Sequence, residues 1–240
     1  FLERLNDARA NPTAYGQSIG VDLSYIAPSA PLGFDVRLID AARGHSQDMN
    51  DRAYFSHTGA GGSSPGQRMS AAGYPSQGWA ESIAAGYGTP EVALRELIID
   101  TGVPNLGHRH HLLAYQSYGA ANHRDIGVGI VQNGSGPYRH YYTADTGLTA
   151  DTRPALTGVA YQDTNSNGRY DAGEGLGGVT VTVSGVGSTT TSASGGYTLK
   201  LNPGTYTVTA SGGGVGSFTR TVTVGGANQR LNILPGTTSP

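Results

Sequence analysis

Two histidines and two carboxylic acids in the first half of the chain are the residues best able to perform chemistry. His57 follows an aromatic pair, Glu81 follows the only tryptophan by two positions, and Asp100 ends an apolar run shortly before His108. Two imidazoles and two carboxylates are the minimum set for a divalent metal with an activated water, or for general acid–base catalysis. We therefore treat all four as candidate catalytic residues, and the two histidines also as candidate zinc ligands.

Helices are predicted around these residues by their capping signals. Asp35 is placed to cap a helix that runs to about residue 51 with one apolar face. Ser64, the proline after it and Gln67 predict a short helix with a capping box. A threonine–proline pair opens a third helix over residues 89–102, whose inward positions are apolar.

A β-hairpin is predicted between residues 126 and 145. Two alternating runs flank Asn133-Gly134, which is a turn-forming pair. Helices packed on a small antiparallel sheet make an α+β layer architecture. We expect this fold class for the first part of the chain.

A series of short motifs in the same region carries a family resemblance. The motifs occur in the family's order, and the ordered set is specific although each motif alone is weak. Together they resemble the bacterial branch of the CAP superfamily (cysteine-rich secretory, antigen 5 and pathogenesis-related proteins, also called SCP-like) over about residues 1–148. They are Ala41–Met49, Phe55–Gly59, Ser64–Arg68, Gly73-Tyr74, Ala80–Gly86 and Gly107–Arg109.

The resemblance implies an α-β-α sandwich with a central cleft lined by two histidines and two acidic residues. His57 matches the first histidine of that cleft, His108 the second, and Glu81 the acid of a Gly-Glu-Asn motif that here reads Ala80-Glu81-Ser82. Alone, His57 is better explained as a histidine that hydrogen-bonds a carbonyl. The joint match favours a cleft role for all three residues.

The second family acid has two candidates. In the family it follows a tryptophan by three positions; Leu97 stands at the tryptophan position here, which assigns Asp100 as the acid. Asp100 reaches one methylene less far than a glutamate. Glu96 is the alternative, although one turn earlier on a helix it is expected on a neighbouring face.

Composition excludes several classes of function. The 240 residues carry a net charge of −2 and a single lysine, Lys200, so no basic field for nucleic acid is expected. The chain has no cysteine, which excludes disulfides and thiolate nucleophiles, and favours a bacterial origin because eukaryotic family members are cysteine-rich. No apolar run approaches the roughly 20 residues of a membrane helix.

We expect a secreted or cell-surface protein, in mature or trimmed form because Phe1 lies inside a helical pattern.

The chain changes character near residues 149–155. All seven histidines precede this point, and Thr, Val and Gly in period-2 alternation follow it. Strands are expected over 178–183, 196–201, 204–210 and 218–224, which is typical of a β-sandwich. The Gly-Tyr-Thr-Leu and Pro-Gly-Thr-Tyr-Thr-Val segments resemble carboxypeptidase-regulatory and adhesin B-type modules, which implies an Ig-like or transthyretin-like sandwich. The predicted domains are 1–150 and 156–235.

A twelve-residue calcium loop is the most specific motif of the second domain. Asp163-Thr-Asn-Ser-Asn-Gly-Arg-Tyr-Asp-Ala-Gly-Glu174 has an oxygen donor at every required position and glycine at the sixth. The flanks are strand-like, so the loop lacks the usual pair of helices. The alternative is a polar turn without metal. The predicted Ca²⁺ ligands are Asp163, Asn165, Asn167, the carbonyl of Arg169, Asp171 and Glu174.

Two classes of function remain for the first domain. It is either a secreted module that binds an extracellular small molecule, lipid, glycan or peptide, or a metal-dependent hydrolase of peptides or polysaccharide. In the hydrolase, His57 and His108 would hold Zn²⁺, Glu81 would act as general base, and Asp100 would orient a histidine or complete the ligand set. We favour the binding module, with the β-sandwich as a spacer or cell-surface attachment module.

Overall fold

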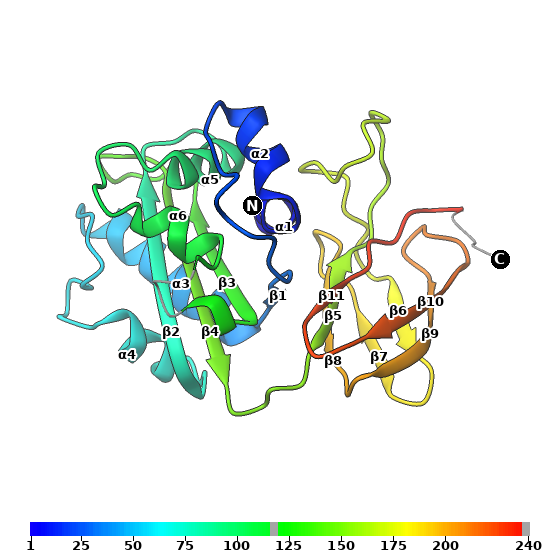
Figure 1. Ribbon diagram of the computed structural model, residues 1–240. Coiled ribbons are helices and arrows are strands. Elements are labelled where there is room, and N and C mark those ends of the chain that lie inside the picture. The colour runs from blue at the N-terminus through cyan, green and yellow to red at the C-terminus, as the bar shows by residue number, and fades with distance from the viewer. Residues whose placement is uncertain (116–119, 237–240) are drawn as a thin grey trace. The chain divides into compact units, whose positions relative to one another are not determined.

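The computed structural model describes residues 1–115 and 120–236, and the chain divides into two compact units, Phe1–Thr152 and Arg153–Pro240. The domains predicted over 1–150 and 156–235 fall within these units. Figure 1 shows helices and a sheet in the first unit and strands and loops in the second.

The first unit is built on a four-stranded sheet. Its strand order is β1-β3-β4-β2, in which β1 pairs with β3 in parallel and the other pairs are antiparallel. Strand β2 is therefore an edge strand, and β4 lies inside the sheet. The strands are β1 (Gly33–Phe34), β2 (Ser76–Ala85), β3 (Asp125–Val131) and β4 (Tyr141–Thr149).

Helices cover both faces of this sheet, as the α-β-α prediction requires. The α+β class is confirmed. The helices are α1 (Leu2–Ala10), α2 (Pro12–Ile19), α3 (Val36–Asp51), α4 (Pro65–Ala71), α5 (Pro90–Ile99) and α6 (Gly107–Leu112), followed by the 3₁₀ turn η2 (Ala120–Asn122).

Capping residues define the ends of the helices that surround the site. The Asp35 side chain accepts the N–H of Arg37 at the start of α3, and Ser64 and Gln67 form a reciprocal capping box on α4. Helix α5 ends at Ile99, earlier than the predicted residue 102, because Asp100 adopts a left-handed conformation with φ of 60°. Asp tolerates this conformation better than most residues.

The predicted hairpin is present, but its turn is longer than expected. Strands β3 and β4 pair antiparallel, and residues 132–140 connect them. Asn133 has a positive φ, as a tight turn would require, yet the Gly134 N–H bonds to the carbonyl of Arg139 instead of closing a two-residue turn. A wide loop therefore replaces the predicted Asn-Gly turn.

Helix α3 approaches the sheet closely because β3 carries glycines on that face. A Cβ at Gly127 would lie 2.0 Å from the backbone of Leu38, and one at Gly129 would lie 2.1 Å from the carbonyl oxygen of Ala42. No side chain fits at such distances. The opposite face packs the main apolar cluster, which includes Leu94, Ile98, Leu112, Ile126 and Tyr142.

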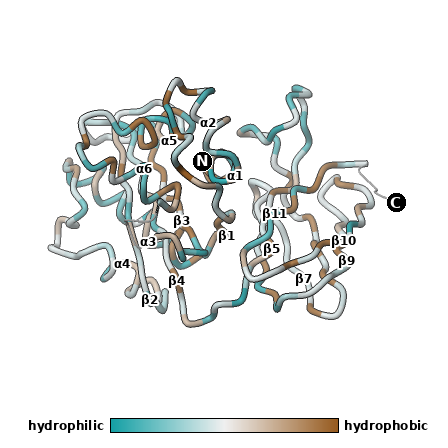
Figure 2. Tube along the Cα trace, viewed as in Figure 1, coloured by the Kyte–Doolittle hydropathy of each residue, from teal (hydrophilic) through white to brown (hydrophobic). Residues whose placement is uncertain are grey.

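The second unit consists of two sheets with an apolar core between them. One has the strand order β10-β9-β6-β7 and the other β11-β5-β8. Alternate residues of β6, β9 and β10 are buried, as the period-2 pattern predicts. The loop between β5 and β6 is hydrophilic at its tip (Figure 2). The strands are β5 (Ala155–Val159), β6 (Thr180–Val183), β7 (Gly187–Thr190), β8 (Gly196–Lys200), β9 (Gly204–Ser211), β10 (Phe218–Val224) and β11 (Gln229–Arg230).

Candidate functional site

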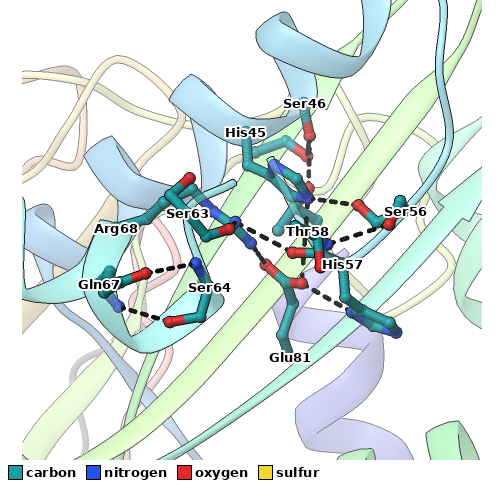
Figure 3. Close-up of polar contacts among 12 residues, drawn as sticks. His45, Ser46, Ser56, His57, Thr58, Ser63, Ser64, Gln67, Arg68 and Glu81 are labelled. Atoms are coloured by element: carbon teal, nitrogen blue, oxygen red, sulfur yellow. Dashed lines mark hydrogen bonds and ion pairs between the residues drawn. The ribbon is translucent and has the colours of Figure 1, made fainter. Parts of the chain in front are cut away.

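Glu81 on edge strand β2 pairs with a histidine and an arginine at once (Figure 3). One carboxylate oxygen lies 2.7 Å from Nδ1 of His57, and the other accepts a 2.6 Å hydrogen bond from Arg68 on α4. Arg68 also donates to the carbonyls of His57 and Ser63. The guanidinium thus fixes both the acid and the loop that carries its histidine.

The charge of Glu81 is buried but compensated. Its side chain is 1% exposed, whereas that of His57 is 51% exposed. Burial acts to raise the pKa of Glu81, but the hydrogen bond with His57 and the charge of Arg68 together lower it. Glu81 is therefore a carboxylate near neutral pH, and both of its oxygens are occupied.

A second carboxylate–histidine pair lies where α5 ends and α6 begins. Asp100 Oδ1 lies 2.7 Å from Nδ1 of His108, and Oδ2 accepts the backbone N–H groups of His108 and Arg109. These N–H groups open α6 and have no partner within the helix. Arg109 reaches back to the carbonyls of Ile98 and Ile99, which holds the end of α5 in place.

Both histidines present the same ring nitrogen to their surroundings. A carboxylate only accepts hydrogen bonds, so the Nδ1 of His57 and of His108 carries the hydrogen in each pair. The Nε2 atoms are then lone-pair acceptors. Such a nitrogen can accept a ligand hydrogen bond, take a proton or bind a metal.

A pocket of about 210 Å³ adjoins the second pair. Phe55 comes from the His57 loop, and the remaining walls come from the end of β2 and the residue Tyr87 beyond it, from α5, from the connection between α5 and α6, and from the start of α6. Asp100, His108 and also Glu96 line it, although Glu96 was expected on another face. His57 and Glu81 lie outside its walls. The lining residues are Phe55, Ile83, Ala84, Ala85, Tyr87, Glu96, Leu97, Asp100, Thr101, Val103 and His108.

Sequence reasoning missed the polar residues behind Glu81. Arg68 was noted only as part of a motif, and Asp145 only as the end of a hairpin, but Asp145 on β4 faces Glu81 in the strand register and is fully buried. Among the described residues, neither oxygen of Asp145 has a hydrogen-bond partner, and neither has Nδ1 of the buried His45. The only sequence signal was a charged residue within an otherwise buried strand pattern.

Asp145 is held in its neutral form by these surroundings. Burial is the main cause that raises the pKa of Asp145 well above its usual range, and the adjacent negative charge of Glu81 adds to it. Arg68 provides one positive charge against two carboxyl groups. The pair therefore carries one negative charge, on Glu81.

A second group of buried polar side chains, joined by hydrogen bonds, lies on the opposite face of the sheet. His111 on α6 joins Ser82 on β2 to Thr146 on β4, at 2.7 and 2.6 Å, and Thr146 continues to His123. Burial lowers the pKa of His111 to about 3 and that of His123 to about 4, so both are neutral. These hydrogen bonds attach α6, and with it His108, to the strand that bears Glu81.

The predicted calcium loop closes on its own oxygens. Asp163 accepts the N–H groups of Asn167 and Gly168 through separate carboxylate oxygens. Gly168 has a φ of 74°, a left-handed conformation that favours glycine at this turn. The start of the loop therefore folds back toward the first predicted ligand.

The last predicted ligand holds the loop from the other end. Glu174 accepts the N–H of Thr164 with one oxygen and that of Asp171 with the other. The bond from Asp171, followed by those from Thr164, lowers the pKa of Glu174. The donor set is all oxygen, which suits Ca²⁺.

Two further findings concern metals and membranes. Within residues 1–115 and 120–236, no three or more His, Asp and Glu side chains are grouped so as to hold a metal ion. No helix in these ranges combines the length and the hydrophobicity needed to cross a membrane.

Comparison with protein families confirms both resemblances. The sequence model described as the cysteine-rich secretory protein family matches residues 2–146, and that of the carboxypeptidase regulatory-like domain matches residues 169–234. The uncharacterized protein YkwD of Bacillus subtilis is 35% identical over 105 residues, which are 44% of this chain and 37% of that protein. The chain thus matches little more than a third of that relative's length.

Solved structures give weaker similarity. An extracellular protein containing an SCP domain from Bacillus anthracis is 24% identical with a TM-score of 0.40, over 62% of this chain and 40% of that one. An outer surface protein of Borrelia burgdorferi is 15% identical with a TM-score of 0.43, over 61% of this chain and 90% of that one. TM-scores of this size do not support an inference about function.

The neutral state of Asp145 predicts a pH effect on stability. Its folded pKa is raised, so the folded chain keeps a proton that the unfolded chain loses as pH rises above about 4. Stability should then fall with rising pH, by up to about 1.4 kcal/mol per pH unit, until the folded pKa is reached. Asp145→Asn removes this loss. In urea unfolding, the free energy of unfolding of the variant should therefore rise relative to that of the wild type between pH 5 and pH 8.

The exposed Asp40 on α3 provides the control. Asp40→Asn should keep a constant stability difference from the wild type over the same pH range. Parallel pH profiles for the wild type and Asp145→Asn would contradict a protonated Asp145.

Proposed function

The chain belongs to the cysteine-rich secretory protein family, and we propose that its first unit is a secreted module that binds an extracellular lipid, glycan or peptide in the pocket beside His108. The pocket itself carries this proposal. Most of its walls are apolar or aromatic, and the Asp100–His108 pair supplies one oriented polar group, which is the usual composition of a ligand site.

His108→Ala tests the binding proposal. Lipids, glycans and peptides would be screened by their effect on the imidazole resonances of the ¹⁵N-histidine-labelled protein. A ligand that shifts His108 should bind about tenfold more weakly to the variant, because one hydrogen bond of about 1.4 kcal/mol is lost. His140→Ala, outside the pocket lining, should bind normally. Ligands that bind without shifting His108 would place the binding site elsewhere.

A metal-dependent hydrolase of peptides or polysaccharide is the second candidate. Its support is that each imidazole has a carboxylate at Nδ1 and a free Nε2, the arrangement common among metal-bound histidines. His57 and His108 would hold Zn²⁺, which would supply Lewis-acid activation. However, they provide two ligands where catalytic zinc sites use three, and Glu81 already bonds His57 and Arg68. The geometry therefore favours Glu81 as a residue that orients His57 over its predicted role as general base.

Zinc or cobalt titration tests the hydrolase. The hydrolase alternative requires one metal site at neutral pH. The affinity of this site for the metal should fall toward pH 5, because only neutral imidazole binds metal. His57→Ala and His108→Ala should each abolish the site, whereas Asp163→Ala should not. Glu81→Gln should keep the metal and lose any hydrolysis. If no such site is found, the hydrolase alternative fails and the binding module stands.

For the second unit, we propose a calcium-stabilised spacer or cell-surface attachment module. The support is the loop of oxygen donors from Asp163 to Glu174, which connects β5 to β6 across the two sheets of the unit. An ion that binds only the folded loop stabilises the whole sandwich by mass action. Asp163, Asp171 and Glu174 are not grouped as a metal site in the described residues, so the proposal requires their carboxylates to turn toward the ion. Three carboxylate ligands suggest an affinity in the extracellular range.

Thermal unfolding in calcium and in EDTA tests this role. At a free calcium concentration of about 100 times the dissociation constant, the second unit should gain about 2.7 kcal/mol. Glu174→Gln should abolish most of this gain, and Asp151→Asn, outside the loop, should retain it. Identical transitions in calcium and EDTA would contradict the proposal.

A further inference from the structure

The pocket beside His108 has a chemical bias beyond its apolar character. Its volume exceeds the roughly 150 Å³ that admits benzene in an engineered protein cavity, so it has room for an apolar group. Ile83, Leu97 and Val103 supply aliphatic walls, and Phe55 and Tyr87 supply rings. The occupant's body is therefore apolar.

His108 determines what kind of polar group the pocket accepts. Its Nδ1–H is donated to Asp100, so Nε2 presents a lone pair. A hydroxyl or ammonium can donate to this atom. A carboxylate or phosphate has no hydrogen to give and would bring its own lone pairs against it.

The charge of Asp100 is not cancelled by its partners. At pH 8, where imidazole is ordinarily neutral, the three groups that donate to it are the His108 imidazole and two backbone N–H groups, none of which carries a full positive charge. Arg109 is close in sequence, but its guanidinium bonds the carbonyls of Ile98 and Ile99 and is absent from the pocket walls. The lining at the base of the pocket therefore presents a carboxylate without a lysine or arginine beside it in the described walls.

Glu96 adds a second carboxylate to the wall. One of its oxygens, Oε1, accepts both bonds from Arg95, and the two side chains are 25% and 47% exposed, so this ion pair is solvated and weak. In the described part of the chain, the lining contains two carboxylates and neither lysine nor arginine. The rings of Phe55 and Tyr87 also attract cations through their faces.

We infer that the pocket selects a primary ammonium group carried on a short apolar stem, with the ammonium donating to His108 Nε2 near Asp100 and Glu96. This inference rests on the proposed ligand-binding function and names the class of ligand. The ammonium comes from a free amine or from a lysine side chain of a peptide.

Three probes of equal chain length test the inference: n-hexylammonium, n-hexanol and n-hexanoate. They would be titrated at pH 8, where imidazole is mostly neutral, and followed by the His108 imidazole resonances. We expect hexylammonium to bind most tightly, at least about tenfold more tightly than hexanoate, with hexanol between them.

Glu96→Gln should weaken hexylammonium binding about threefold or more and leave hexanol unchanged. The matched control is Glu91→Gln, which removes a carboxylate from the exposed side of the same helix. It should change neither affinity. A control that weakens hexylammonium as much as Glu96→Gln does would overturn the role of the pocket wall.

The outcomes separate this inference from the proposed function. Hexanoate that binds as tightly as hexylammonium overturns the ammonium preference, while binding in the pocket stands. If no probe shifts His108, both proposals fail. Cadaverine and Nα-acetyl-lysine amide then distinguish the sources: tighter binding of the first assigns a free amine, and tighter binding of the second a peptide.

Discussion

The buried ion pair between Arg68 and Glu81 is the interaction on which the arrangement of the His57 loop depends. Arg68 satisfies the carboxylate and also binds two carbonyls of the loop that carries His57, so one guanidinium fixes acid, loop and imidazole. Removing one partner of a buried pair usually costs 3–5 kcal/mol, because the other charge is left uncompensated. A neutral Asp145 is part of the same balance, since a second carboxylate would exceed the single positive charge available.

The position of β2 at the sheet edge explains how elements from two layers meet at one strand. Successive residues of a strand point to opposite faces, so Glu81 contacts α4 while Ser82 binds His111 on α6. The His57 loop and the junction of α5 with α6 can both reach this edge because no strand lies beyond it. The same strand thus sets the positions of both carboxylate–histidine pairs.

Local signals in the sequence predicted the fold class, three helix starts and four strands of the second unit (β6, β8, β9 and β10), because caps and period-2 alternation act over a few residues. Partners that meet only through tertiary packing were not predictable. Nothing near Asp145 indicates that its strand lies inside the sheet opposite Glu81, and nothing near Glu96 indicates that it lines the same pocket as Asp100. The family resemblance selected His57, Glu81, Asp100 and His108 as candidates, whereas their hydrogen-bond partners Arg68 and the backbone of α6 required the structure.

The two carboxylate–histidine pairs are alike in geometry and different in charge. Glu81 is neutralised by the full charge of Arg68, whereas Asp100 is held by dipoles alone. Hydrogen bonds from backbone N–H groups stabilise a carboxylate without removing its charge, so a negative field persists at the His108 pair and is absent at the His57 pair. A ligand of the kind that we propose would therefore meet apolar walls and two carboxylates in the pocket beside His108, whereas the exposed imidazole of His57 lies outside that pocket.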